Sequence, residues 1–157
     1  MALYIGVDPA FRKNGFALCI IDTSDKTARF KMFKNGFIDF ASWFLFDAPE
    51  RAIFCVENSN LQNKTFVMAG SKAVIADRSR KVGKNQAISQ NTVDLLRTKY
   101  KVVDCSPREK GKKWNAALYK LIMKQEKHIT TKDASNQDER DSYQLALIAL
   151  KMPYLAK

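Results

Sequence analysis

The chain has little histidine and cysteine, the residues on which several common catalytic and metal sites depend. His128 is the only histidine in 157 residues, so a histidine-based catalytic triad or a metal site with several histidine ligands is not expected. The three cysteines are odd in number, far apart, and set in or beside apolar runs: Cys19, Cys55 and Cys105. This pattern indicates buried, reduced thiols and no zinc knuckle. Any metal ion would have to be held by carboxylates.

Long apolar runs are also missing. No stretch approaches the roughly 18 apolar residues of a membrane span, and the N-terminal segment turns polar at Asp8, which argues against a signal peptide. We therefore expect no membrane partner. The expected location is cytoplasmic, for a bacterial or virus-encoded protein, and an organellar location stays open.

Acidic residues are outnumbered by basic ones. The chain has 27 Lys and Arg against 16 Asp and Glu, a formal net charge of +11 that favours a polyanionic partner such as nucleic acid. An anionic membrane surface would suit this charge as well. With 46% apolar residues, a chain of this length can bury one substantial core without disulfides or metal ions, so we expect a single domain over residues 1–157.

The apolar pattern predicts a mixed α/β structure. Short apolar runs bounded by turn residues predict strands at 3–7, 15–21, 28–37, 52–56 and around 102–103. A period of 3.6 residues predicts helices at 40–46, 63–97, 114–122 and 138–151. In chain order, these elements predict an antiparallel meander of three strands joined to parallel strands and flanked by helices.

Three of the helices carry more specific expectations. Residues 63–97 should form two helices, because the basic stretch 77–84 contains a glycine. Ser135 or Asn136 should be the N-cap of the last helix. The helix at 114–122 should bury one face, formed by Trp114, Ala117, Leu118, Leu121 and Ile122.

Four carboxylates stand out by their positions. Asp8 and Glu57 each follow an apolar strand directly. Asp138 and Asp141 are three residues apart near the start of the last helix, hence on one face, and that face continues into the apolar Leu145. Each acid alone fits a turn residue or an acid at a helix start. Together, two strand ends and one buried helix face could bring all four side chains into one cluster.

The segments around these acids resemble the RuvC type of Holliday-junction resolvase, a family in the RNase H-like superfamily. Residues 4–9 are similar to the family's opening strand with its first catalytic aspartate, and residues 54–57 to its strand ending in the catalytic glutamate. Residues 138–142 resemble its D-x-x-D-A helix start, and residues 82–88 the small-residue helix that follows the glutamate. These segments occur in the family's order over nearly the whole chain.

The resemblance implies an RNase H-like mixed sheet and a crossover junction endodeoxyribonuclease. Such an enzyme acts as a homodimer and cuts a four-way DNA junction symmetrically by phosphodiester hydrolysis. The implied catalytic residues are Asp8, Glu57, Asp138 and Asp141, together with Lys110 and Lys113 as candidates for the family's essential lysines. In well-known relatives an aromatic shortly after the glutamate wedges into the junction, and here the nearest aromatic is Phe66.

Phosphodiester hydrolysis fits these carboxylates without the family name. Two Mg²⁺ ions about 3.5–4 Å apart, with Mn²⁺ as a substitute, activate water and neutralise the phosphate, and such ions select hard oxygen ligands. Asp8 is the candidate for the bridging ligand and Glu57 for the ligand of the ion that activates water. Asp138 and Asp141 would complete the set of metal ligands. We expect no small-molecule cofactor.

Two groups of basic residues are candidates for DNA contacts, the alternative for each group being a solvated face. They are Arg78, Arg80, Lys81 and Lys84 in the first group, and Arg108 and Lys112 beside the two catalytic lysines in the second. Residues 72–96 could also form the dimer surface, with packing inside one subunit as the alternative.

Two other functions remain open at this point. The four acids specify phosphodiester cleavage but neither the sugar nor the topology, so an RNase H-like nuclease acting on structured or hybrid RNA is one alternative. A non-catalytic protein that binds junctions is the other, since it would keep the basic surface without needing the acids. Neither the cleavage sequence preference nor the physiological metal follows from the sequence.

Overall fold

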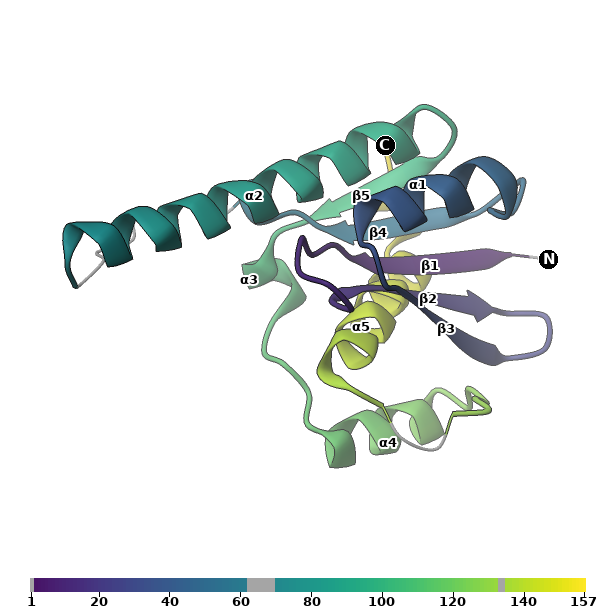
Figure 1. The fold of residues 1–157 in the computed structure, drawn as a ribbon. Helices are drawn as coiled ribbons and strands as arrows, with labels where there is room; N and C mark the ends of the chain where they lie inside the picture. The colour runs from purple at the N-terminus through teal and green to yellow at the C-terminus, as the bar shows by residue number, and fades with distance from the viewer. Residues whose placement is uncertain (1, 62–69, 133–134) are drawn as a thin grey trace.

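The structure, a computed structural model, describes residues 2–61, 70–132 and 135–157. Five strands form one mixed sheet in the order β3-β2-β1-β4-β5 (Figure 1). Their bounds are Leu3–Asp8 (β1), Phe16–Asp22 (β2), Thr27–Phe33 (β3), Ile53–Glu57 (β4) and Lys101–Cys105 (β5). The first three strands pair in antiparallel fashion, and β4 and β5 continue the sheet parallel to β1. The expected meander with added parallel strands is confirmed.

Helices cover both faces of this sheet. The α-helices are Phe37–Phe46 (α1), Lys72–Arg97 (α2), Pro107–Lys110 (α3), Ala116–Gln125 (α4) and Gln137–Lys151 (α5). Two 3₁₀ turns lie at Ser59–Leu61 (η1) and Pro153–Leu155 (η2). In Figure 1, α1 and α2 lie on one side of the sheet, α5 crosses the other side, and α4 stands apart beyond α5. None of the helices in these described ranges is both long and apolar enough to cross a bilayer.

The alternation of side chains along β1 explains the two layers. Ile5 and Val7 are fully buried in the core with α1 and α2, whereas the intervening Gly6 faces α5. A Cβ atom at Gly6 would lie 2.0 Å from the backbone oxygen of Ser142 and 2.3 Å from the backbone nitrogen of Ala146. Only glycine therefore lets α5 cross β1 this closely, and the crossing brings the first turns of α5 beside the end of β1.

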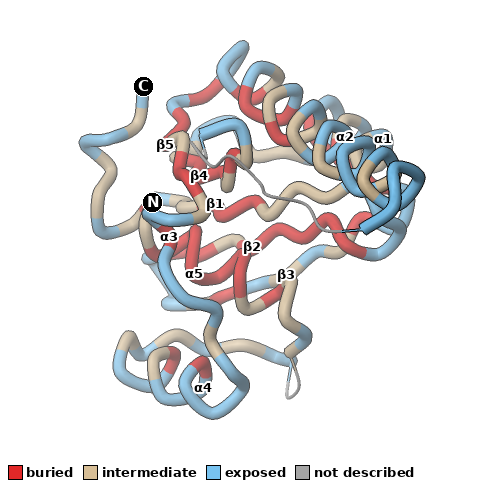
Figure 2. Tube along the Cα trace, turned by 90° about the vertical axis from the view of Figure 1, so that its left-hand side faces the viewer, coloured by how far each residue is buried: buried red, intermediate tan, exposed pale blue. Residues whose placement is uncertain are grey.

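Aromatic side chains fill the layer under α1 and α2. The Phe16 and Phe40 rings stack with centroids 5.0 Å apart, and both side chains are fully buried. The layer under α5 combines tyrosines such as Tyr143 with all three cysteines, which are buried and free as expected. Figure 2 shows the buried positions concentrated along the strands and α5.

Helix α2 is one continuous helix, where the sequence predicted two. It runs without a break through residues 77–84, since the exposed Gly83 costs only about 1 kcal/mol and the basic residues lie in water. Ser71 starts the helix by accepting a hydrogen bond from the Val74 backbone. The N-terminal half of α2 projects beyond the sheet (Figure 1). The predicted start of this region falls partly on residues 62–69, which include Phe66 and lie outside the described residues.

The buried face of α4 was predicted only in part. Trp114 and Ile122 pack, partly buried, against the cluster around Tyr143, but the leucines do not. The helix starts after Asn115, whose side chain accepts a hydrogen bond from the Leu118 backbone, so Trp114 lies outside it. Leu118 and Leu121 are 40% and 52% exposed, and the buried residues are Tyr119 and Met123, which pack with Cys19, Tyr143 and their neighbours. Tyr119 has ring contacts with Phe30 and Tyr143, so this short helix buries its aromatic side chain in preference to its leucines.

The end of β3 and the start of α5 can also be compared with the sequence prediction. The third strand ends at Phe33 instead of residue 37, because Gly36 adopts a positive φ of 66° and turns the chain into α1. Of the two expected N-caps of α5, Asn136 is the one observed, in a capping box with Glu139. The one-turn helix α3, capped by Ser106, was not predicted.

Candidate active site

The four predicted carboxylates line one cavity of about 260 Å³: Asp8, Glu57, Asp138 and Asp141. Asp8 ends β1 and Glu57 ends β4, and these strands are parallel neighbours in which Val7 pairs with Val56. The two acids are therefore adjacent at the carboxyl edge of the sheet. The close crossing of α5 at Gly6 supplies the other two acids from the first two turns of that helix.

Lys110 lies between the strand acids and the helix acids. Its Nζ atom donates a hydrogen bond to Glu57 Oε2 at 2.6 Å and lies 3.7 Å from Asp141 Oδ2. Only 4% of the Lys110 side chain is exposed. Burial lowers the pKa of this lysine, but Glu57, Asp141 and Asp8 together outweigh burial and raise it. Lys110 therefore remains a cation inside the cluster.

The backbone around Lys110 is held from both sides. Ser106 and Glu109 close a capping box over the one-turn helix α3. From α5, Gln144 Nε2 donates hydrogen bonds to the backbone oxygens of Lys110 at 2.7 Å and of Lys112 at 3.3 Å. The lysine is thus positioned by the same helix that carries two of the acids.

The pKa of the Asp8 carboxyl is shifted by its surroundings. Its pKa is raised well above the ordinary 3.8, first because burial removes the carboxyl from water and then because Glu57 is negatively charged. Asp141 and Asp138 add to this effect, while Lys110 opposes it. The ionised form of Asp8 is therefore disfavoured in the folded protein, first by burial and then by the neighbouring acids.

Arg12 is a cavity residue that the sequence prediction missed. Its guanidinium donates from one nitrogen to both carboxylate oxygens of Asp138, each at 2.8 Å. Asp141 accepts a hydrogen bond from Gln137 at 2.8 Å on the same helix. The only sequence signal for Arg12 was its place four residues after Asp8, in a segment interpreted as a turn.

The donor set fits a hard divalent cation in its chemistry. Four carboxylates offer oxygen ligands only, and three basic side chains line the same cavity: Arg12, Lys110 and Lys113. As the side chains stand, no three acid, histidine or cysteine residues in the described part of the chain are close enough together to hold a metal ion. Lys110 and Arg12 occupy the oxygens of Glu57 and Asp138 instead.

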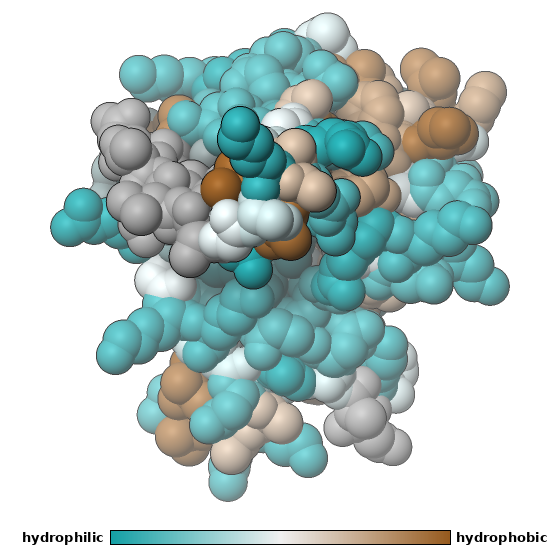
Figure 3. Space-filling model, turned by 60° about the vertical axis from the view of Figure 1, so that its left-hand side comes forward, coloured by the Kyte–Doolittle hydropathy of each residue, from teal (hydrophilic) through white to brown (hydrophobic). Residues whose placement is uncertain are grey.

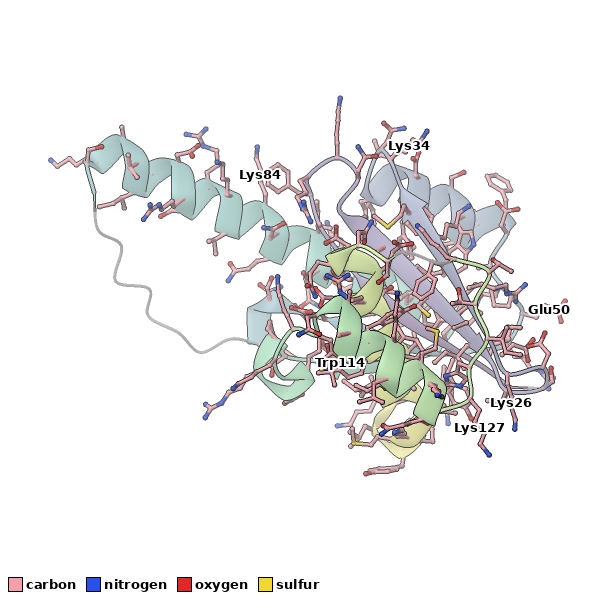
Figure 4. All side chains as sticks on the ribbon, turned by 90° about the horizontal axis from the view of Figure 1, so that it is seen from below. Lys26, Lys34, Glu50, Lys84, Trp114 and Lys127 are labelled. Carbon is pink, nitrogen blue, oxygen red and sulfur yellow. The ribbon has the colours of Figure 1, made fainter. Side chains whose placement is uncertain are left out.

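The predicted basic residues separate into three positions. Lys110 and Lys113 line the cavity, Lys110 buried and Lys113 exposed. Arg108 and Lys112 are exposed nearby but do not line it. The third set lies on the projecting half of α2, where Figure 4 labels Lys84: Arg78, Arg80, Lys81 and Lys84. None of this third set lines the cavity, and Lys81 pairs with Asp77 at 3.1 Å.

The side of the molecule from which α2 projects is mostly hydrophilic (Figure 3). Polar residues of α2 and η1 also line the cavity, among them Ser59, Asn85 and Ser89, which were not predicted. Behind them, Asn58 is fully buried, and its backbone N–H donates to the Cys105 oxygen at 2.8 Å. This contact fixes the chain that leaves Glu57 against β5.

Comparisons with known proteins support the fold. No family model matches the chain, and no curated protein sequence matches it. Among solved structures, the chain is similar to T. thermophilus RuvC, determined in complex with a Holliday junction substrate. The superposition covers 100% of this chain and 99% of that chain, with a TM-score of 0.52 and 13% sequence identity. The fold is RNase H-like. At this identity the similarity establishes the architecture, and the activity has to be argued from the site.

Proposed function

We propose that the protein is a metal-dependent endonuclease that resolves four-way DNA junctions by phosphodiester hydrolysis. The observation that carries this proposal is the cavity into which β1, β4 and α5 together bring four carboxylates. The RNase H-like fold and the junction bound by the similar RuvC structure support it. The net charge of +11 suits a substrate with a phosphate backbone.

The acids of the cavity would hold two Mg²⁺ ions, with Mn²⁺ as a substitute, and Asp8 is our candidate for the ligand that both ions share. Such ions, when bound, activate the attacking water and neutralise charge on the phosphate. Lys113, exposed at the cavity, is placed to contact the phosphate that is cut. Lys110 keeps its proton and holds Glu57 and Asp141 in position.

The basic residues outside the cavity would contact flanking DNA. Arg108 and Lys112 lie close to the cavity, and the basic residues of the projecting half of α2 would meet duplex further away. We propose that a two-fold homodimer presents two such cavities, so that each subunit cuts one of the two equivalent strands. Mixing wild type with Asp8→Asn should then yield junctions nicked on one strand.

A substrate panel tests the proposal. Labelled four-way DNA junction, linear duplex, RNA–DNA hybrid and structured RNA are incubated with Mg²⁺, Mn²⁺ or chelator. We expect paired cuts in the junction that require metal and are lost in Asp8→Asn, with Asp94→Asn, an exposed acid of α2, as the matched control. Cleavage of hybrid or RNA with the junction intact would indicate the RNase alternative. Tight junction binding without cleavage in either metal would indicate the non-catalytic one.

A further inference from the structure

Arg12 occupies an unusual position for an exposed arginine. It lies in the loop between β1 and β2, and 64% of its side chain is exposed. Its guanidinium nevertheless holds both oxygens of Asp138, whose side chain is only 17% exposed. The arginine therefore reaches from the surface into the acid cluster.

The loop is built to hold Arg12 there. The Gly15 backbone N–H donates to the Arg12 backbone oxygen at 3.2 Å and closes a tight turn. Gly15 is buried, and a Cβ atom on it would lie 2.5 Å from Arg12 Cγ and 2.7 Å from Arg12 Nε. A residue larger than glycine at this position would push the arginine side chain off its path.

The other side of the loop is attached to the basic helix α2. The Phe11 backbone N–H donates to Asn85 Oδ1 at 3.3 Å, and Lys84 Nζ lies 5.2 Å from the centre of the Phe11 ring. The loop thus connects α2, which carries predicted DNA contacts, to Asp138 at the start of α5.

A guanidinium binds carboxylates and phosphates with the same donor geometry. Arg12 and a divalent cation compete for the oxygens of Asp138, because two positive groups on one carboxylate repel each other. When a cation takes Asp138, the positive charge of Arg12 is left at the mouth of the cavity, where a DNA phosphate would arrive.

We propose that Arg12 exchanges partners during substrate binding. Without metal and DNA it neutralises Asp138, and when a divalent cation binds the acids it transfers to a phosphate of the substrate. Metal and DNA would then bind cooperatively, each favouring the other through this one side chain. The inference rests on the proposed metal-dependent function and assigns Arg12 as a residue that couples the two ligands.

The experiment measures Mg²⁺ affinity by calorimetry without DNA, and junction affinity by fluorescence anisotropy with chelator and with Mg²⁺. For wild type, Mg²⁺ should strengthen junction binding by about fivefold or more. For Arg12→Gln, Mg²⁺ should bind more tightly in the absence of DNA. Junction affinity of this variant should be nearly the same with Mg²⁺ as with chelator. Lys13→Gln, an exposed neighbour that does not line the cavity, should weaken junction binding but keep the wild-type strengthening.

Two further variants separate coupling from a purely structural ion pair. Gly15→Ala keeps the arginine but displaces it, so it should act in the same direction as Arg12→Gln. In an Asp138→Asn background, Arg12→Gln should no longer alter Mg²⁺ affinity. The inference would be overturned if Mg²⁺ strengthened junction binding equally in Arg12→Gln and Lys13→Gln. It would also be overturned if Arg12→Gln only lowered the melting temperature and left that strengthening unchanged. Either result would leave the proposed function standing. Absence of Mg²⁺ binding by wild type would instead overturn the proposed function itself.

Discussion

Replacement of Asp8 by asparagine should stabilise the protein while removing one ligand of the proposed metal site. The substitution keeps the shape of the side chain and removes one negative charge from a cluster in which Glu57, Asp141 and Asp138 surround it. Because the pKa of Asp8 is raised in the folded state, its ionised form opposes folding.

The size of the effect follows from comparable substitutions that remove an unfavourable charge. Such changes commonly raise the unfolding free energy by about 0.5–2 kcal/mol, and we expect a gain of this order in the absence of metal. For a domain of this size that corresponds to a rise in Tm of roughly 2–4 °C per kcal/mol.

The sign of the pH dependence distinguishes this cause from others. Below pH 3.8, the ordinary pKa of an aspartate, the carboxyl is protonated in both states and its charge costs nothing. The cost grows as the pH rises from there through the folded-state pKa and is constant above it. The advantage of Asp8→Asn should accordingly be small near pH 4 and grow as the pH rises.

Thermal unfolding with chelator over this pH range, with Asp94→Asn as a control, measures the difference. Adding Mg²⁺ should raise the Tm of wild type, since a ligand that binds only the folded state stabilises it, and should raise that of Asp8→Asn much less. A lower Tm for Asp8→Asn at neutral pH, or an advantage that does not change with pH, would refute the electrostatic interpretation of the cluster.

Three other outcomes are expected. Lys110→Met should lower the unfolding free energy by about 2 kcal/mol in chelator. The loss is smaller than the roughly 3–5 kcal/mol of breaking a fully buried ion pair, because Glu57 also faces the cavity. In a melting experiment, Mg²⁺ should restore part of this loss. Gly6→Ala should prevent stable folding, as seen by circular dichroism, whereas Gly83→Ala should stabilise the protein by about 1 kcal/mol. Junction affinity should fall by about 0.9 log unit per log unit of salt for each phosphate contacted, and Lys84→Ala should lower that slope by about one contact.

Each of these outcomes has a contrary result. A Lys110→Met protein as stable as wild type would mean that Glu57 and Asp141 do not depend on the lysine. A folded Gly6→Ala protein would contradict the close crossing of α5. A salt slope unchanged by Lys84→Ala would remove the projecting half of α2 from the DNA surface.

The sequence predicted the sheet and the four acids because both depend on local patterns. A carboxylate directly after an apolar strand has to lie at the strand's end, and two acids three residues apart on a helix have to share a face. These local patterns suffice to single out Asp8 and Asp141 without the path of α5.

The errors arose where a tertiary partner decides the outcome. The leucines of α4 fit a helical stripe, but the side chain that is buried is Tyr119, because Tyr143 of α5 offers it a ring contact at 5.5 Å. Arg12 was missed for the same reason, since its approach to Asp138 depends on the space that Gly15 leaves and on a helix 126 residues further along the chain.

The glycine in β1 connects the fold to the chemistry of the site. The absence of a side chain at Gly6 brings the backbone of α5 close to β1, and two residues further along β1 the same proximity brings Asp8 up against the acids of α5. The repulsion among these acids cannot be relieved by moving α5 outward without exposing its buried residues, such as Leu145 and Ala149. The core thus holds the carboxylates together against their charge, and the proposed divalent-cation site depends on this arrangement.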